Sequence, residues 1–487
     1  MDKFLAFFRL FRFKWLYSDW ISNFVRCLCC LLFLWAVWCL CADVGGWVGS
    51  CGGVLPILGL LVSFLALLKD IREFAVQFHS REDMDCFNVR DPSAKQELIG
   101  MWAKSTKDKT GFTVHCLERG GEFMDFVSYS DDLNRRFVDG FQLPFTVTPF
   151  RRTNCWEQIH SGLSEALKVL ALKLKNSRRH DQDFSNESKV VLVSEFRRVL
   201  DGAKRGQPEA RIGIAKSCYY ASYLTNESYR DFCYDGMNKG HRLHYRGDWT
   251  PAGAGDSTCL PDFTAPKSFH VGVNTLGITS DGWFCLWIQD KGQRSTNLIA
   301  PSGSGSMDWS DVRHARGRSF NSVVIHAAER ELQEESFDKE TRNRLRETQT
   351  PLASRITGMY RWGSLGGLPG FALVTLIPLN HDEIHLPPKR GHGGNGEVVM
   401  DSEKNHLDVL PDVILDGDAA GDFGQWRPKC IETVNQFRKM NESSLSVPLD
   451  VCFSFFVDAL GTNEEFGRWI HSFLARKEAQ RVGGVQS

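Results

Sequence analysis

Residues 319–336 read SFNSVVIHAAERELQEES and are the most informative segment of this 487-residue chain. We expect them to form a helix. Before them, residues 268–290 hold two apolar, β-prone runs around an Asp-Gly pair, which predicts a β-hairpin. After them, residues 368–379, LPGFALVTLIPL, predict a buried strand. With a Gly/Ser-rich loop expected over residues 292–311, the order of elements indicates a mixed α/β domain.

Three carboxylates share one face of the predicted helix. Glu331, Glu334 and Glu335 are spaced i, i+3 and i+4, which places their side chains together. Such a cluster repels itself unless a cation neutralises it, and Mg²⁺ or Mn²⁺ would do so and also carry phosphates. Arg330 lies one turn before Glu334, where an ion pair can orient that glutamate. Taken alone, a cluster of this kind is more often a solvated helix face.

The segment RELQEES at residues 330–336 resembles the core of the Nudix box. The family pattern is G-x5-E-x7-R-E-U-x-E-E-x-G-U, where U is an apolar residue. The preceding Pro301-Ser302-Gly303 resembles the loop that comes before the helix in that family. The resemblance implies a Nudix-like α/β/α sandwich over residues 265–430. Five residues match the core of the pattern position by position: Arg330, Glu331, Leu332, Glu334 and Glu335.

The outer frame of the box departs from the family pattern. Its opening glycine falls on Arg316 and its first glutamate on Ser322, while its last two positions fall on Phe337 and Asp338. The resemblance therefore implies a metal site at the three glutamates and a site that recognises nucleotides with little turnover. If hydrolysis occurs, the catalytic candidates are Glu334 and Glu335.

Other cations are candidates for contacting nucleotide phosphates. Arg330 is one, and Lys389 and Arg390 are two more, because they begin the glycine-rich run KRGHGGNG at residues 389–396. Glycines with flanking cations can wrap phosphates through backbone N–H groups. The run matches no Walker pattern, and a flexible surface loop is the alternative.

Two long apolar runs near the N-terminus predict a transmembrane hairpin. Residues 21–42 and 47–68 are each long enough to cross the bilayer as a helix. Lysines and arginines flank the pair but are missing from the turn between the runs, so both termini are expected in the cytoplasm. A signal peptide is the alternative, but no small-residue cleavage motif is present. Residues 1–20 predict a basic amphipathic segment on the membrane surface.

Small residues recur at the hairpin turn. Gly45, Gly49 and Gly53 either allow the helices to associate closely or simply form the turn.

The rest of the chain is expected to fold in the cytoplasm. We predict a mixed α/β region over residues 69–250, with a helix at residues 188–204, and a helical extension over residues 431–487. The chain has 58 basic and 59 acidic residues, a balance that argues against bulk nucleic acid as a partner.

The combination of hairpin and Nudix-like domain resembles the two-transmembrane Nudix effectors of CBASS anti-phage systems. That resemblance implies a homo-oligomer in the bacterial inner membrane. It would bind a cyclic oligonucleotide made by a CD-NTase and disrupt the membrane, which ends in abortive infection. The alternatives are a membrane-anchored Nudix hydrolase of nucleoside diphosphate-linked substrates and a scaffold for protein contacts.

Overall fold

The computed structural model divides the chain into two compact units by contacts between Cα atoms. The first unit comprises Met1–Arg90, Trp156–Arg179 and Asp231–Pro251, and the remaining residues form the second. The residues described are 86–89, 103–119, 122–148, 187–194, 196, 211–226, 232–235, 242–243, 260, 262–264, 268–288, 298–315, 319–347, 351–385, 406–407 and 422–483.

The predicted hairpin over residues 21–68 and the segment 1–20 lie outside the described residues, as do Lys389 and Arg390. Within the described ranges, no helix combines the length and the hydropathy that crossing a bilayer requires. In the first unit, strand β7 (Phe232–Asp235) pairs antiparallel with β1 (Cys86–Val89) and with β8 (Arg242–Leu243).

The second unit is a mixed α/β structure, as expected, and its largest described sheet has six strands in the order β13-β10-β15-β14-β3-β2. Strands β10 and β15 run parallel, and the other neighbours are antiparallel. Every residue of β15 is buried, which confirms the strand predicted from LPGFALVTLIPL. The strands are β2 (Thr113–Arg119), β3 (Glu122–Tyr129), β10 (Gly272–Thr279), β13 (Gly303–Ser306), β14 (Ala353–Trp362) and β15 (Leu368–Ile377).

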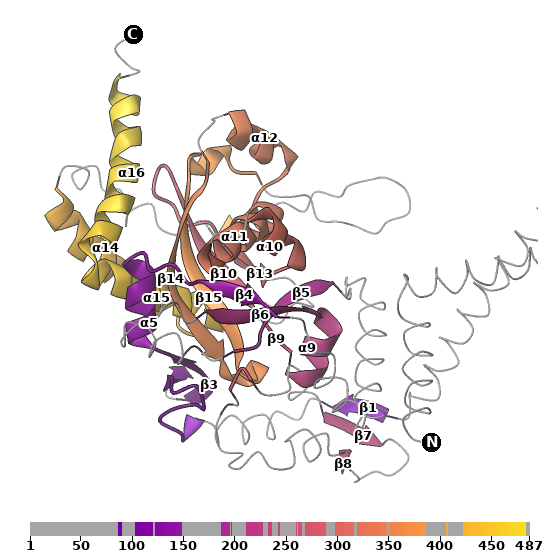
Figure 1. Ribbon diagram of the computed structural model, residues 1–487. Helices are drawn as coiled ribbons and strands as arrows, with labels where there is room; N and C mark the ends of the chain where they lie inside the picture. The colour runs from indigo at the N-terminus through magenta and orange to yellow at the C-terminus, as the bar shows by residue number, and fades with distance from the viewer. Residues whose placement is uncertain are drawn as a thin grey trace, which may run out of the picture. The chain divides into compact units, whose positions relative to one another are not determined.

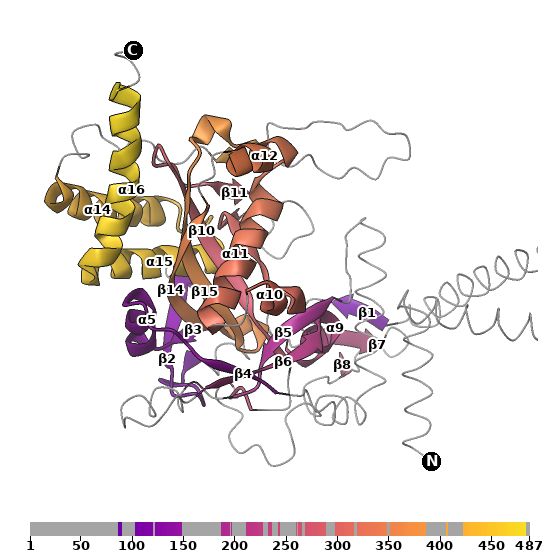
Figure 2. The same cartoon turned by 45° about the horizontal axis from the view of Figure 1, so that its top comes forward.

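Helices cover both faces of this sheet (Figures 1 and 2). Side chains alternate along a strand, so Val273 and Leu373 join the core beneath α11, while Leu276 and Val374 join the core beneath α15. Strands β2 and β3 and helix α5 precede residue 250 in the chain but belong to the same unit. The helices are α5 (Asp131–Val138), α10 (Trp309–His314), α11 (Phe320–Ser336), α12 (Lys339–Glu347), α14 (Phe423–Met440), α15 (Val447–Thr462) and α16 (Glu464–Gly483).

A second sheet overturns one prediction. Residues 188–192 were expected to begin a helix, but they form strand β5 (Ser188–Leu192), between β6 (Ile212–Cys218) and β9 (Phe269–His270). The sheet also contains β4 (Phe145–Val147), and helix α9 (Tyr219–Thr225) follows β6. Residues 190–192 are fully buried. A strand buried on both faces reads as a continuous apolar run, which periodicity alone does not separate from a helix.

The expected loop at residues 292–311 also contains regular structure. It holds β12 (Ile299–Ala300), β13 and the start of α10. Strand β13 reads Gly-Ser-Gly-Ser, and its glycines are needed because a Cβ on Gly303 would lie 2.6 Å from the backbone nitrogen of Leu332. The composition that predicted a loop therefore reflects the close packing of α11 on this strand.

The predicted hairpin turn forms at Gly282, whose φ of 89° suits glycine. A bridge joins Ile278 to Phe284 across the turn. The chain then enters β11 (Leu286–Ile288), which pairs with β12 and β16 (His406–Leu407) in a separate small sheet.

Candidate functional site

Helix α11 presents its polar C-terminal half at the edge of the six-stranded sheet. Its N-terminal half is anchored by buried apolar residues such as Val323, Val324 and Ala327. Ser319 caps the helix, and its hydroxyl accepts a hydrogen bond from the backbone N–H of Ser322 at 3.3 Å. The position of the first glutamate in the box therefore lies in the capped first turn and carries no carboxylate.

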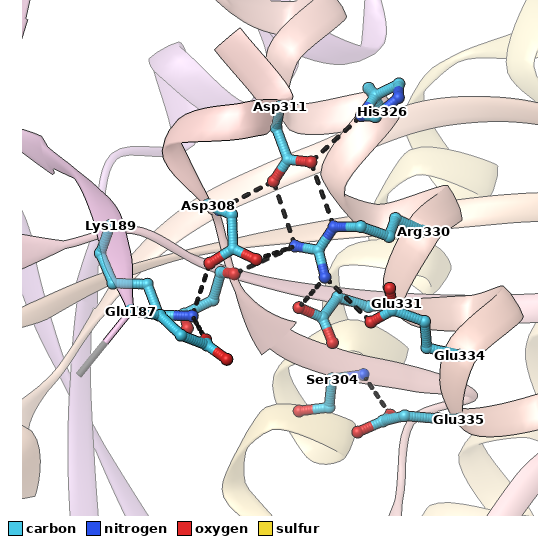
Figure 3. Close-up of polar contacts among 11 residues, drawn as sticks. Glu187, Lys189, Ser304, Asp308, Asp311, His326, Arg330, Glu331, Glu334 and Glu335 are labelled. Atoms are coloured by element: carbon cyan, nitrogen blue, oxygen red, sulfur yellow. Dashed lines mark hydrogen bonds and ion pairs between the residues drawn. The ribbon is translucent and has the colours of Figure 1, made fainter. Parts of the chain in front are cut away.

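Arg330 is the centre of the cluster (Figure 3). Its Nε and Nη2 donate to the two carboxylate oxygens of Asp311 on α10, each at 3.1 Å. Its Nη1 lies 2.9 Å from Glu331 Oε1 and 3.1 Å from Glu334 Oε2. The ion pair expected between Arg330 and Glu334 is therefore present, but the strongest geometry is the two-pronged contact with Asp311.

Asp311 is a fully buried carboxylate held on three sides. The backbone N–H of Asp308 donates to it at 2.8 Å within a capping box, and His326 Nδ1 lies 3.2 Å from it. Burial alone would raise the pKa of Asp311, but the hydrogen bonds from His326 and Arg330 outweigh it and lower that pKa to about 2. The pKa of Arg330 is correspondingly raised, so the two groups form a permanent ion pair.

The three glutamates of the box are brought together. The side chain of Glu331 is 13% exposed and that of Glu334 is 54% exposed. Glu335 is exposed as a residue, yet its carboxylate accepts a hydrogen bond from the backbone N–H of Ser304 on β13 at 2.7 Å. The spacing i, i+3 and i+4 therefore predicted the shared face correctly.

Burial and mutual repulsion disfavour the ionised forms of Glu331 and Glu335. Loss of hydration raises the pKa of Glu331 to about 7, and repulsion from Glu334 adds to the effect although Arg330 opposes it. Loss of hydration and repulsion from Glu331 raise the pKa of Glu335 to about 8. Carboxyl groups in this state gain from a nearby cation.

Lys189 joins the cluster from β5. Its Nζ lies 2.6 Å from Glu187 Oε2 and 2.6 Å from Asp308 Oδ1, and its side chain is 7% exposed. Its charge also lowers the pKa of Glu331. In the described part of the cluster, Lys189 contacts Glu187 and Asp308, and Arg330 contacts Asp308, Asp311, Glu331 and Glu334, whereas Glu335 is held by Ser304 (Figure 3).

Sequence reasoning missed Lys189, Asp308, Asp311 and Ser304. Only the aspartates carried a local signal, because Asp308 and Asp311 have the spacing of a capping box ahead of a helix. The expected phosphate contacts at Lys389 and Arg390 lie outside the described residues and stay predictions.

The carboxylates of this cluster are the ligand type of a divalent cation, but their arrangement in the structure is not that of a formed cation site. Among the described residues, no three His, Cys, Asp or Glu side chains are already arranged around a metal position. Arg330 draws Glu331 and Glu334 to one side, while Ser304 holds Glu335 on another. The donors are nevertheless all carboxylate oxygens, the ligand type that hard cations prefer.

The sequence matches no protein-family model and none of the curated proteins.

Proposed function

We propose that this chain is a membrane effector of a nucleotide-signalled antiviral defence system of the CBASS type. In this proposal its Nudix-like region, residues 265–430, binds a cyclic oligonucleotide made by a CD-NTase, with Mg²⁺ or Mn²⁺ held by Glu331, Glu334 and Glu335. Binding then leads the hairpin of residues 21–68 to associate with copies of itself and to disrupt the bacterial inner membrane. The apolar runs that predict the hairpin and the resemblance of RELQEES to the Nudix box support this assignment.

One structural observation supports the nucleotide-binding part most directly. Lys189 and Arg330 contact Glu187, Asp308, Asp311, Glu331 and Glu334, and burial together with mutual repulsion raises the pKa values of Glu331 and Glu335 to about 7 and about 8. A divalent cation would relieve this repulsion and release the protons that these groups hold. The bound cation would in turn attract the phosphates of a nucleotide.

Sensing is favoured over hydrolysis by the N-terminal half of α11. Ser322 stands where the Nudix pattern has a glutamate, and its backbone N–H serves the helix cap. Arg330 is committed to Asp311, a residue of α10 outside the box. The site therefore keeps the carboxylates of the core without the outer carboxylate of the family.

A diphosphate hydrolase is the second candidate, and Glu335 favours it. Its carboxylate is held in place by the backbone N–H of Ser304 at 2.7 Å, and a positioned carboxylate can act as a general base that activates water. The bound cation would supply polarisation of a phosphate.

The deciding experiment uses the full-length chain in a mild detergent. Calorimetry with Mn²⁺, followed by a panel of cyclic di- and trinucleotides, should show one nucleotide that binds only when Mn²⁺ is present. Chromatography of the same mixture should recover that nucleotide intact. Rapid Mn²⁺-dependent breakdown of the nucleotide would favour the hydrolase. Nucleotide binding that is equally tight without Mn²⁺ would contradict the proposed role of the carboxylates as cation ligands.

Matched variants locate the site. Glu331→Gln and Glu335→Gln each remove one charged ligand while keeping the side chain's size, so Mn²⁺ affinity should fall markedly. Glu340→Gln on α12 is the control, because Glu340 is 63% exposed and pairs with Arg344 outside the cluster. Mn²⁺ affinity in the control should equal that of the unchanged chain.

A further inference from the structure

We draw no further inference here: the strongest candidate, the pocket that Phe423, Arg427 and Arg468 line between helices α14 and α16, carries nothing, because both arginines already bind oxygens of the protein itself and nothing among the described residues shows what would occupy it.

Discussion

The guanidinium of Arg330 faces the fully buried carboxylate of Asp311, and Nε and Nη2 each lie 3.1 Å from one of its oxygens. This contact joins α11 to α10, two helices that are adjacent in the chain. The remaining nitrogen of Arg330 holds Glu331 and Glu334. Arg330 therefore stabilises the fold and arranges the carboxylates of the site at the same time.

Replacing Arg330 by lysine should destabilise the fold. Lysine keeps the charge but loses the planar fork that meets both oxygens of Asp311. A buried carboxylate left with an incomplete partner costs about 1–3 kcal/mol of unfolding free energy. Urea unfolding of the full-length chain in detergent, followed by tryptophan fluorescence, measures the change.

The control for this variant is Arg344→Lys on α12, whose partner Glu340 is 63% exposed. Exposed pairs of this kind contribute little, so no measurable change is expected. Equal losses in the two variants would contradict the special role of the contact with Asp311.

Stability in metal-free buffer should fall as pH rises from about 5 to about 8. The pKa values of Glu331 and Glu335 in the folded chain, about 7 and about 8, exceed their ordinary value of 4.5. The folded state therefore binds these protons more tightly than the unfolded state, and it loses that advantage as pH rises through the two folded-state values. Asp311, with a pKa of about 2, acts oppositely, and its contribution is lost as pH falls from about 4 towards 2.

Melting temperatures measured against pH with a chelator present test this prediction. Glu335→Gln should flatten the decline between pH 5 and pH 8, and Glu340→Gln should not. Saturating Mn²⁺ should also flatten the decline, because the cation replaces the protons. A profile that rises across this interval would show that the two glutamates are not the dominant titrating groups.

Gly305→Ala should disturb the site directly. A Cβ at Gly305 would overlap the carboxyl group of Glu331, so that side chain would have to leave its position beside Arg330. Mn²⁺ affinity should fall on the order of tenfold or more. Gly272→Ala on β10 is the control, because the nearest atom to its new Cβ would be Pro369 O at an ordinary 3.5 Å. Normal Mn²⁺ binding by Gly305→Ala would exclude Glu331 as a ligand.

Deleting residues 1–68 should abolish toxicity in cells that contain the activating nucleotide. The proposal assigns membrane disruption to the predicted hairpin of residues 21–68, and the rest of the chain is assigned to sensing. Cell viability and uptake of a membrane-impermeant dye measure the effect. A truncated chain that still permeabilises the membrane would place the toxic element elsewhere.

Local sequence patterns correctly predicted those helices and strands whose periodicity or apolar run lies within a single segment. The helix expected over residues 319–336 is present as α11, and the first ten residues of LPGFALVTLIPL form the fully buried strand β15. The helix predicted to begin at residues 188–192 was wrong, because a strand that is buried on both faces lacks the apolar–polar alternation by which strands are identified. Strand β13 was predicted as part of a loop because of its glycines. Those glycines are instead required by the close packing of α11 on the strand, which a local pattern does not reveal.

The sequence by itself determined that Glu331, Glu334 and Glu335 share a helix face and that Arg330 lies one turn before Glu334, because a helix repeats every 3.6 residues. Only the tertiary structure decided which groups meet them. Lys189 reaches the cluster from a strand more than 100 residues earlier in the chain, and Ser304 ties Glu335 to Asn274 and Tyr360. Such contacts follow from strand pairing and helix packing between distant segments. No spacing within a single segment encodes them, because their geometry exists only once the sheet has formed.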